Sequence, residues 1–251
     1  MADVENTLRE RHRPAHAERT AQTHAAFLLP HLRPGMALLD LGCGPGSITA
    51  GLAAAVAPGP VTGVDTEPPD RLDGVTLVRA DAADLPLPDA SFDAVFASAL
   101  LQHVPDPLAV LREARRVARP GAVIGVVDAD WSGRLLEPSN DLLEESYPLM
   151  EVLRTGSPYV GRQLRGLLHE AGFARCEAGA RAIAHGSADE VASFAGFNRS
   201  WFTNESIVDS LVRRGVTTPA RMAEIAAAWA AWGEEPGAFF AAFWCEAVAW
   251  V

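Results

Sequence analysis

Three glycines alternate with other residues in the segment Asp40–Gly46, which reads Asp-Leu-Gly-Cys-Gly-Pro-Gly. Because Gly42, Gly44 and Gly46 have no side chains, the backbone can turn sharply there and approach a ligand closely. Ser47 stands where the dinucleotide-binding pattern G-x-G-x-x-G requires its last glycine, which weakens a nicotinamide interpretation. No Gly-Lys-Ser/Thr follows, so a Walker loop is excluded. The spacing predicts a ligand-binding turn of another kind, with a tight turn that binds nothing as the alternative.

Polar residues follow the ends of the next three expected strands. Asp65 ends the second strand, where a carboxylate can accept hydrogen bonds from both hydroxyls of a ribose. Asp81 comes just after the third strand and could accept a hydrogen bond from the exocyclic amine of an adenine, and Ser98 ends the fourth. Ligands of α/β sheets bind at the carboxyl ends of the strands. These residues and the glycine loop therefore predict one nucleoside-binding site.

The order of the apolar segments predicts the elements that position these residues. Met36–Leu41 is an apolar run without alternation, as expected of a strand covered on both faces of a parallel sheet. Strands and helices then alternate, which indicates a doubly wound α/β sheet. We expect strands at 61–65, 75–79, 92–98, 122–128, 174–184 and 239–251 and helices at 47–56, 107–118 and 161–172. Because only residues 66–74 connect the second strand to the third, the crossover helix there should be lost or reduced to a turn.

Composition narrows the class of protein. The chain has 251 residues, of which 49% are hydrophobic, and this suits one large α/β domain over residues 1–251. A formal net charge of −11 disfavours nucleic acid and anionic membranes as partners. The first residues lack the apolar core of a signal peptide, so we expect a cytoplasmic protein. The three cysteines are widely separated and contain no C-x-x-C pair, so we expect reduced thiols.

Four segments, in order along the chain, resemble the class I S-adenosylmethionine-dependent methyltransferases, most closely the ubiquinone and menaquinone biosynthesis group. They are Leu38–Gly46, Gly63–Asp65, Ala80–Asp93 and Gln102–Asp106, and the resemblance covers residues 36 to about 128. It implies a Rossmann-like, mostly parallel seven-stranded sheet with an antiparallel last strand and helical insertions that form a cap. The sequence departs from the family at Ala80, where glycine is common, and in the missing helix after Asp65.

The resemblance also implies the cofactor, S-adenosylmethionine, with S-adenosylhomocysteine as its product, and no metal. The glycines would pack against the methionine part, Asp65 would hold the ribose, Asp81 and the Ala82 backbone would bind adenine, and Asp40 would brace the loop. The full set of expected cofactor-binding residues is Asp40, Gly42, Gly44, Gly46, Asp65, Thr66, Asp81, Ala82, Ser98 and Arg19.

Catalytic and substrate residues are predicted less directly. His103 is the candidate general base, because it follows the fourth strand and its pKa range suits proton transfer. The alternative is that it only fixes the turn before Pro105. Expected substrate-binding residues are Asp130, Trp131, Tyr159, Arg162, Phe197 and Trp201, for which capping and core packing are the alternatives. His12 and His16 have helical i, i+4 spacing, but with no third ligand they indicate a solvated face rather than a metal site.

The predicted organisation assigns these residues to four parts. Residues 1–35 are expected to form an N-terminal helical lid with an amphipathic helix at 15–32, on which Arg19 and His24 could close over the cofactor. Residues 36–130 are expected to form the core, and residues 131–156 and 188–236 to form insertions on the substrate side. The predicted function is methyl transfer to oxygen, nitrogen or electron-rich carbon of a small, apolar or aromatic metabolite. An S-adenosylmethionine-binding protein with another reaction or no catalysis, and a nicotinamide oxidoreductase, are the alternatives. The methyl acceptor and the oligomeric state are not readable.

Overall fold

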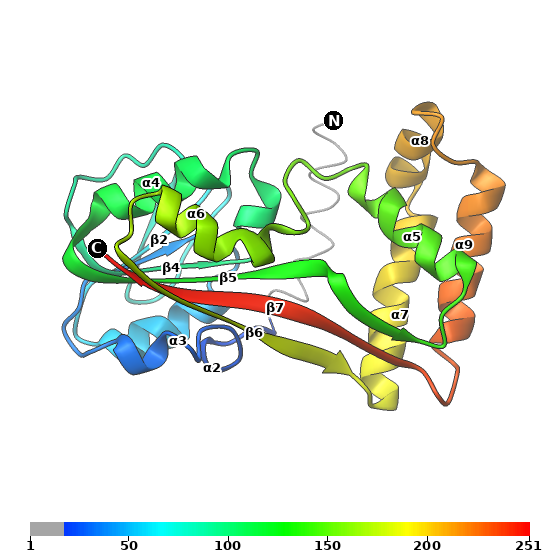
Figure 1. Ribbon diagram of the computed structural model, residues 1–251, viewed down its shortest axis with the longest axis horizontal. Coiled ribbons are helices and arrows are strands. Elements are labelled where there is room, and N and C mark those ends of the chain that lie inside the picture. The colour runs from blue at the N-terminus through cyan, green and yellow to red at the C-terminus, as the bar shows by residue number, and fades with distance from the viewer. Residues whose placement is uncertain (1–17) are drawn as a thin grey trace. The chain divides into compact units, whose positions relative to one another are not determined.

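A computed structural model describes residues 18–251 and contains one seven-stranded sheet in the order β3-β2-β1-β4-β5-β7-β6 (Figure 1). The strands are β1 (Leu38–Leu41), β2 (Val61–Asp65), β3 (Val75–Arg79), β4 (Phe92–Ser98), β5 (Ala118–Glu137), β6 (Arg175–His185) and β7 (Phe239–Trp250). Strands β1 to β5 pair in parallel. Strand β7 is antiparallel, because the Gly121 N–H at the start of β5 donates to the carbonyl of Val251, just after the end of β7, at 3.0 Å. The predicted fold class is confirmed.

Helices connect the strands. The α-helices are α2 (Ala21–His24), α3 (Ser47–Val56), α4 (Pro107–Val117), α5 (Asp141–Glu151), α6 (Leu164–Glu170), α7 (Ala188–Thr203), α8 (Glu205–Arg213) and α9 (Pro219–Trp232). Short 3-10 helices are η1 (Leu29–His31), η2 (Leu101–His103) and η3 (Val160–Gln163). The connection over residues 66–74 contains only bends and a turn, as its length predicts.

The chain divides into two compact units, which we describe separately. The α/β unit consists, among the described residues, of 18–130, 155–181 and 244–251. The helical unit consists of 131–154 and 182–243. The bounds of its two segments are close to those of the insertions expected at 131–156 and 188–236. The organisation as one domain stays a prediction.

Helices cover both faces of the strands in the α/β unit, α4 and α6 on one face and α2 and α3 on the other (Figure 1). A buried apolar layer lies on each face. On one face, Val110 of α4 and Leu164 of α6 pack into a buried cluster with the strands. On the other face, Leu52 of α3 packs with Leu28, which follows α2. All four residues of β1 are buried, as expected for a strand at the centre of the sheet.

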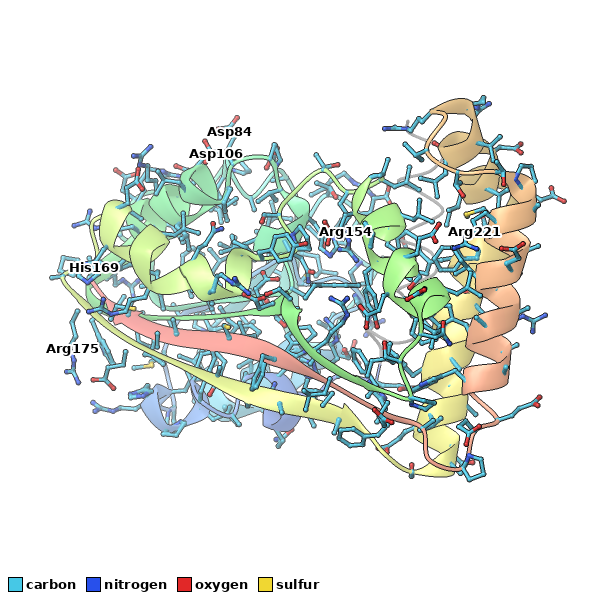
Figure 2. The ribbon with its side chains drawn as sticks, turned by 45° about the vertical axis from the view of Figure 1, so that its right-hand side comes forward. Asp84, Asp106, Arg154, His169, Arg175 and Arg221 are labelled. Carbon is cyan, nitrogen blue, oxygen red and sulfur yellow. The ribbon has the colours of Figure 1, made fainter. Side chains whose placement is uncertain are left out.

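Aromatic packing forms the core of the helical unit. Trp201, Trp229 and Trp232 belong to one buried cluster, and ring contacts connect α7 with α9. The helix starts are fixed locally, as in the capping box between Ser187 and Glu190. Arg221 of α9, labelled in Figure 2, pairs with Glu145 of α5 and so joins these two helices as well.

The structure corrects the prediction of one amphipathic helix over 15–32. A capping box between Thr20 and Thr23 begins α2, the helix ends at His24, and only the 3-10 turn η1 follows. Pro30 lies in that turn and lacks the N–H that an α-helix would need. Residues 15–17, and with them His16 and the earlier His12, lie outside the described residues. Strand β5 is also longer than the predicted 122–128 and continues to Glu137.

Candidate functional site

The glycine loop between β1 and α3 has the backbone that its sequence predicts. Gly44 and Gly46 have φ angles of +51° and +85°, in the left-handed region that favours glycine. A Cβ atom on Gly46 would lie 2.6 Å from a methyl group of Leu72, so a side chain there would force the Leu72 side chain to move. Among the described residues, none lies within 4 Å of a Cβ built on Gly44, so none of them fills the space in front of this glycine. Gly44 is therefore the position where a ligand can approach the backbone.

Asp65, at the end of β2, is held against this loop. One carboxylate oxygen accepts a hydrogen bond from the Gly44 N–H at 3.0 Å, and the other accepts one from the Glu67 N–H at 2.9 Å. The Thr66 hydroxyl is 3.5 Å from the second oxygen. A carboxylate offers about four acceptor positions, so this one keeps capacity for the hydroxyl groups of a ribose. The sequence predicted the ribose contact but not the hydrogen bond that braces the loop.

Asp40 braces the loop from its other side. It is buried, and one of its oxygens accepts a hydrogen bond from the hydroxyl of Thr49 in α3 at 2.6 Å. Burial raises the pKa of Asp40 to about 7, and the nearby Asp65 charge raises it further, whereas the Thr49 hydrogen bond lowers it. The side chain thus joins the end of β1 to the helix after the loop, which is the role the resemblance implies.

The end of β4 and the adjacent part of β5 contribute a second group of polar side chains. Ser98, the last residue of β4, pairs in register with Val127, so it lies next to Asp128 within β5. The hydroxyl oxygen of Ser98 is buried and has no hydrogen-bond partner among the described residues. Ala99 follows with a φ angle of +52°, which is uncommon for a residue with a side chain and typical of a functional strand end. An unsatisfied buried hydroxyl here fits a site completed by a ligand.

Asp128 is fully buried within β5, beside the end of β4. It accepts hydrogen bonds from the backbone N–H groups of Leu101, at 2.8 Å, and of Ala129, at 3.2 Å. Burial raises its pKa to about 7, while these hydrogen bonds and the charge of Arg19 lower it. Asp128 therefore fixes the turn after β4, and its negative charge favours a cation nearby.

That cation is Arg19, which precedes α2. Its guanidinium carbon lies 4.9 Å from the centroid of the Trp244 ring, and burial lowers its pKa to about 10 despite the opposing effect of Asp128. His24 contacts the same indole edge to face, with ring centroids 5.4 Å apart. Burial, followed by the charge of Arg19, lowers the pKa of His24 to about 3. His24 is thus a neutral packing residue, and Arg19 remains the positive group.

Asp81 and Ala82 begin the loop after β3. The Asp81 side chain is exposed, and one of its oxygens accepts a hydrogen bond from the Ala83 N–H at 2.9 Å. Ala82 is buried in the core cluster. This local hydrogen bond orients the carboxylate and leaves its second oxygen for a ligand.

His103, the candidate base, is the last residue of η2. Its side chain is exposed, and its backbone N–H donates to the carbonyl of Leu100 at 2.9 Å. The backbone contact agrees with a turn-fixing role. A role in proton transfer stays a prediction.

The expected substrate residues divide between the two units. In the α/β unit, Arg162 forms a two-pronged ion pair with the buried Asp130, with one contact at 2.7 Å, and lies 5.9 Å from the Tyr159 ring. In the helical unit, the guanidinium of Arg154 lies 4.1 Å from the ring of Trp131. Phe197 is half-buried on α7. Because Arg162 already occupies the Asp130 carboxylate, Asp130 is a weaker candidate for binding an acceptor directly.

Trp201 also lies on α7, but it is only 1% exposed. Its ring belongs to the core cluster of the helical unit. Core packing, the alternative to substrate binding for this residue, therefore describes its position best.

Sequence reasoning did not single out Glu113 and Arg116, which connect α4 to the loop after β3. Their charges, three residues apart on an expected helix, were the available signal. That spacing is so common on exposed helices that it does not identify a site.

Metal binding and membrane insertion receive no support from the part of the chain that the structure describes. No three His, Cys, Asp or Glu side chains among residues 18–251 are grouped as metal ligands would be. Within the same residues, every helix is too short or too polar to cross a bilayer.

Comparison with known proteins agrees with this geometry. Residues 39–126 match the family model of a methyltransferase domain. A 37.1 kDa protein in transposon TN4556 of Streptomyces fradiae is 38% identical over 176 residues, which are 61% of this chain and 48% of that protein. Demethylmenaquinone methyltransferase of Staphylococcus aureus is 34% identical over 128 residues, which are 47% of this chain and 51% of that enzyme. The chain spans about half the length of these relatives.

Solved structures share the fold. Phosphoethanolamine N-methyltransferase 2 of Haemonchus contortus aligns with a TM-score of 0.53 at 16% identity, covering 87% of this chain and 49% of that one. The [4+2]-cyclase SpnF aligns with a TM-score of 0.52 at 24% identity, covering 95% of this chain and 79% of that one. The resemblance to class I S-adenosylmethionine-dependent methyltransferases, predicted from four short segments, is confirmed.

Proposed function

We propose that the protein binds S-adenosylmethionine in the α/β unit and transfers its methyl group to a small molecule. The observation that carries this proposal is that three groups at neighbouring strand ends can contact a ligand. They are the Gly44 backbone, the carboxylate of Asp65 and the buried hydroxyl of Ser98, which has no hydrogen-bond partner within residues 18–251. The methyltransferase family match over 39–126 includes all three. The complex of the Haemonchus contortus enzyme with S-adenosylhomocysteine supports the choice of ligand.

The residues fit the parts of this cofactor in turn. Asp65 would accept from the ribose hydroxyls, with Thr66 beside it, and Asp81 would accept from the adenine amine next to the Ala82 backbone. Gly42, Gly44 and Gly46 let the loop backbone lie against the methionine part. Ser98 would bind its polar end.

Arg19 supplies the charge that the methionine carboxylate requires. Its guanidinium lies against Trp244 and interacts electrostatically with Asp128. A partly buried guanidinium favours a carboxylate partner strongly, because little water competes for it. We therefore place the carboxylate end of the cofactor near Arg19.

Methyl transfer depends more on the alignment of the acceptor with the methyl carbon than on acid or base groups. When bound, a sulfonium supplies an electrophilic methyl carbon, and in-line attack on it requires a correctly oriented acceptor. The bracing of the loop by Asp40 and Asp65 reduces its freedom, which favours a fixed orientation. His103 would remove a proton only for acceptors that must lose one.

For the acceptor, we infer a small apolar or aromatic molecule. The helical unit supports this inference because it is rich in aromatic rings, although its most buried rings, such as Trp229, form its core. Trp131 and Phe197 are aromatic side chains of the same cluster that are only partly buried.

A pair of variants tests the acceptor inference. Phe197→Ala should raise the acceptor KM several-fold, because substrate pockets are largely apolar, and leave the S-adenosylhomocysteine affinity unchanged. Tyr147→Phe changes a buried residue of the same cluster at nearly constant shape, so it should leave the acceptor KM unchanged and serves as the control. Equal losses of acceptor and cofactor binding would contradict a separate acceptor role for these rings.

Calorimetry and product analysis test the function itself. Titration with S-adenosylhomocysteine should give saturable binding, and titration with NAD should give none; the reverse result would favour the nicotinamide oxidoreductase. Incubation with methyl-labelled cofactor and a panel of phenols, amines and indoles should then transfer label. If no member of the panel receives label, the proposal of methyl transfer to this class of substrate would be wrong.

A second candidate is a cofactor-binding protein that catalyses another reaction. The fold likeness to the [4+2]-cyclase SpnF favours keeping this alternative, because one fold hosts several chemistries. Binding of S-adenosylhomocysteine together with substrate conversion that leaves the methyl group on the cofactor would support it.

A further inference from the structure

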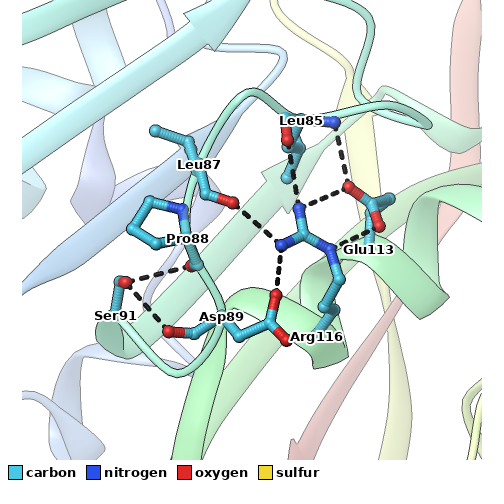
Figure 3. A network of polar contacts seen from close by, with 7 residues as sticks. All are labelled: Leu85, Leu87, Pro88, Asp89, Ser91, Glu113 and Arg116. Atoms are coloured by element: carbon cyan, nitrogen blue, oxygen red, sulfur yellow. Dashed lines mark hydrogen bonds and ion pairs between the residues drawn. The ribbon is translucent and has the colours of Figure 1, made fainter.

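Arg116, on α4, is bonded through every nitrogen of its guanidinium (Figure 3). It donates to both oxygens of Glu113 at 2.7 Å, to the carbonyls of Leu85 at 3.1 Å and Leu87 at 2.8 Å, and to Asp89 at 2.6 Å. The hydrogen bonds with Arg116 are the main reason that the pKa of Glu113 lies below its usual range. A planar fork with five N–H donors suits such a set of acceptors, which a lysine could not serve.

These contacts hold a segment that has little structure of its own. Residues 85–91 contain no helix or strand, and two of them, Pro86 and Pro88, have no backbone N–H. Glu113 accepts a hydrogen bond from the Leu85 N–H at 2.9 Å, and the Arg116 carbonyl accepts one from the Ala90 N–H at 3.0 Å. Ala90 has a φ angle of +49°, a conformation that persists in a non-glycine residue only where its surroundings impose it.

The same segment continues directly from the residues assigned to adenine. The turn Asp81–Asp84 is closed by the Asp84 N–H, which donates to the carbonyl of Asp81 at 3.1 Å. Leu85, the next residue, is the first one that Arg116 and Glu113 hold. The turn with Asp81 and Ala82 is thus anchored at one end by strand β3 and at the other by this pair.

We propose that Glu113 and Arg116 are positioning residues for adenine recognition, because they hold the turn that presents Asp81 and Ala82. The inference rests on the proposed binding of S-adenosylmethionine and assigns a role to residues that do not touch the ligand. It implies that loss of the pair should weaken the contacts of the adenine edge selectively. A pair that only stabilises the fold would affect every cofactor analogue equally.

Two ligands separate these possibilities. S-adenosylhomocysteine has the exocyclic amine that Asp81 would accept from, whereas S-inosylhomocysteine has a carbonyl oxygen in its place. In the unmodified protein, calorimetry should show tighter binding of the adenine ligand. Arg116→Met should weaken S-adenosylhomocysteine by about 5–10-fold, the scale of one lost hydrogen bond, and change S-inosylhomocysteine by less than about 2-fold.

Matched variants complete the test. Arg112→Met removes an exposed arginine from the same helix and should leave both affinities unchanged. Glu113→Gln keeps the shape of the carboxyl group and should shift the preference in the same direction as Arg116→Met but less. Arg116→Lys, which keeps the charge, should restore only part of the preference, and either conservative variant serves if Arg116→Met does not fold.

Hydrogen exchange on the ligand-free protein makes the test independent of the proposed function. Arg116→Met should accelerate exchange of the amides in 82–91 while those of β1 and β2 stay protected. If the unmodified protein binds neither ligand, the proposed function fails and the exchange result still judges the anchoring. Equal weakening of both ligands, or unchanged exchange in 82–91, would overturn the positioning role.

Discussion

Buried polar groups serve different purposes in the two units. In the α/β unit, they join separate elements: Asp40 binds Thr49 of α3, and Asp128 binds the backbone of the turn at Leu101. In the helical unit, Ser146 and Asn198 donate to carbonyls of their own helices. Buried polar contacts thus fix the relative placement of segments in the α/β unit, whereas in the helical unit the buried contacts between helices are mainly aromatic. The comparison therefore predicts that removing a buried ring affects the stability of the helical unit, whereas removing a buried polar group affects the geometry of the α/β unit.

The largest effect should come from removing a central ring of the helical unit. Trp229→Ala deletes a fully buried side chain that contacts Tyr147, Phe194 and Trp232, and it should cost about 3–5 kcal/mol of unfolding free energy. Chemical denaturation followed by circular dichroism measures this cost. Affinity for S-adenosylhomocysteine should change little, and a large loss of affinity would show that the cofactor site depends on the helical packing.

Asp65→Ala should have the next largest effect, on the α/β unit alone. It removes the acceptor assigned to the ribose and the brace on the Gly44 N–H, so cofactor affinity should fall by about 1–3 kcal/mol. Calorimetric titration of S-adenosylhomocysteine provides the measurement. Asp73→Ala, an exposed aspartate on the following connection, is the control. Unchanged affinity in the Asp65 variant would place the ribose elsewhere.

Two glycine substitutions separate folding from binding within one loop. Gly46→Ala forces a left-handed alanine and a collision with Leu72, so it should lower stability by about 1–2 kcal/mol. Gly44→Ala also forces a left-handed alanine, but its Cβ would meet no atom of the described residues within 4 Å, so it should lower stability less than Gly46→Ala and weaken cofactor binding more. Thermal unfolding and calorimetry of both variants provide the test. Adding Leu72→Ala should recover part of the stability lost in Gly46→Ala; similar profiles for the two glycines would contradict the distinction.

The smallest effect concerns pH. Burial raises the pKa of Asp40 to about 7 in the folded chain, against about 3.9 when unfolded. Its contribution to stability is therefore fully present below about pH 4 and is lost as pH rises through 7. Asp40→Asn can still accept from Thr49 but cannot ionise, so its Tm should fall less than that of the unmodified protein between pH 6 and 8. Parallel Tm curves would show that Asp40 is not the titrating group; Asp73→Asn is the control.

The fold of the α/β unit was predictable because its signals are local. Apolar runs in the sequence predicted β2, β3 and β4 with the bounds that the structure has. The shortness of the connection over residues 66–74 predicted that it contains no helix. The helix expected over 15–32 was wrong, because Thr20 and Thr23 begin a separate short helix that ends at His24, and only the 3-10 turn η1 follows it. Periodicity does not reveal such local competition between caps.

The places of the candidate site residues in the fold followed from the sequence in the same way, whereas their roles stay predictions. Gly44, Asp65 and Ser98 were identified from their residue types and their places at strand ends, since parallel strands bring those ends to one edge. The anchoring by Arg116 was not, because a Glu–Arg spacing of three residues is ordinary on helices and its loop partners are backbone carbonyls. Likewise, nothing in the sequence separated Trp201, a core residue, from the half-buried Phe197.

The sequence alone determined the sheet and the glycine loop, because these depend on the identity of residues such as glycine and aspartate at defined distances along the chain, and its resemblance to a known family is the basis of the proposed cofactor. Only the tertiary structure decided which groups brace that loop, which buried hydroxyl lacks a partner among the described residues and which arginine holds the turn at Asp81. Those properties arise from contacts between segments far apart in the chain, such as Ala37 with Asp93 or Leu85 with Glu113. The spacing of residues along the chain does not predict which distant segments come into contact.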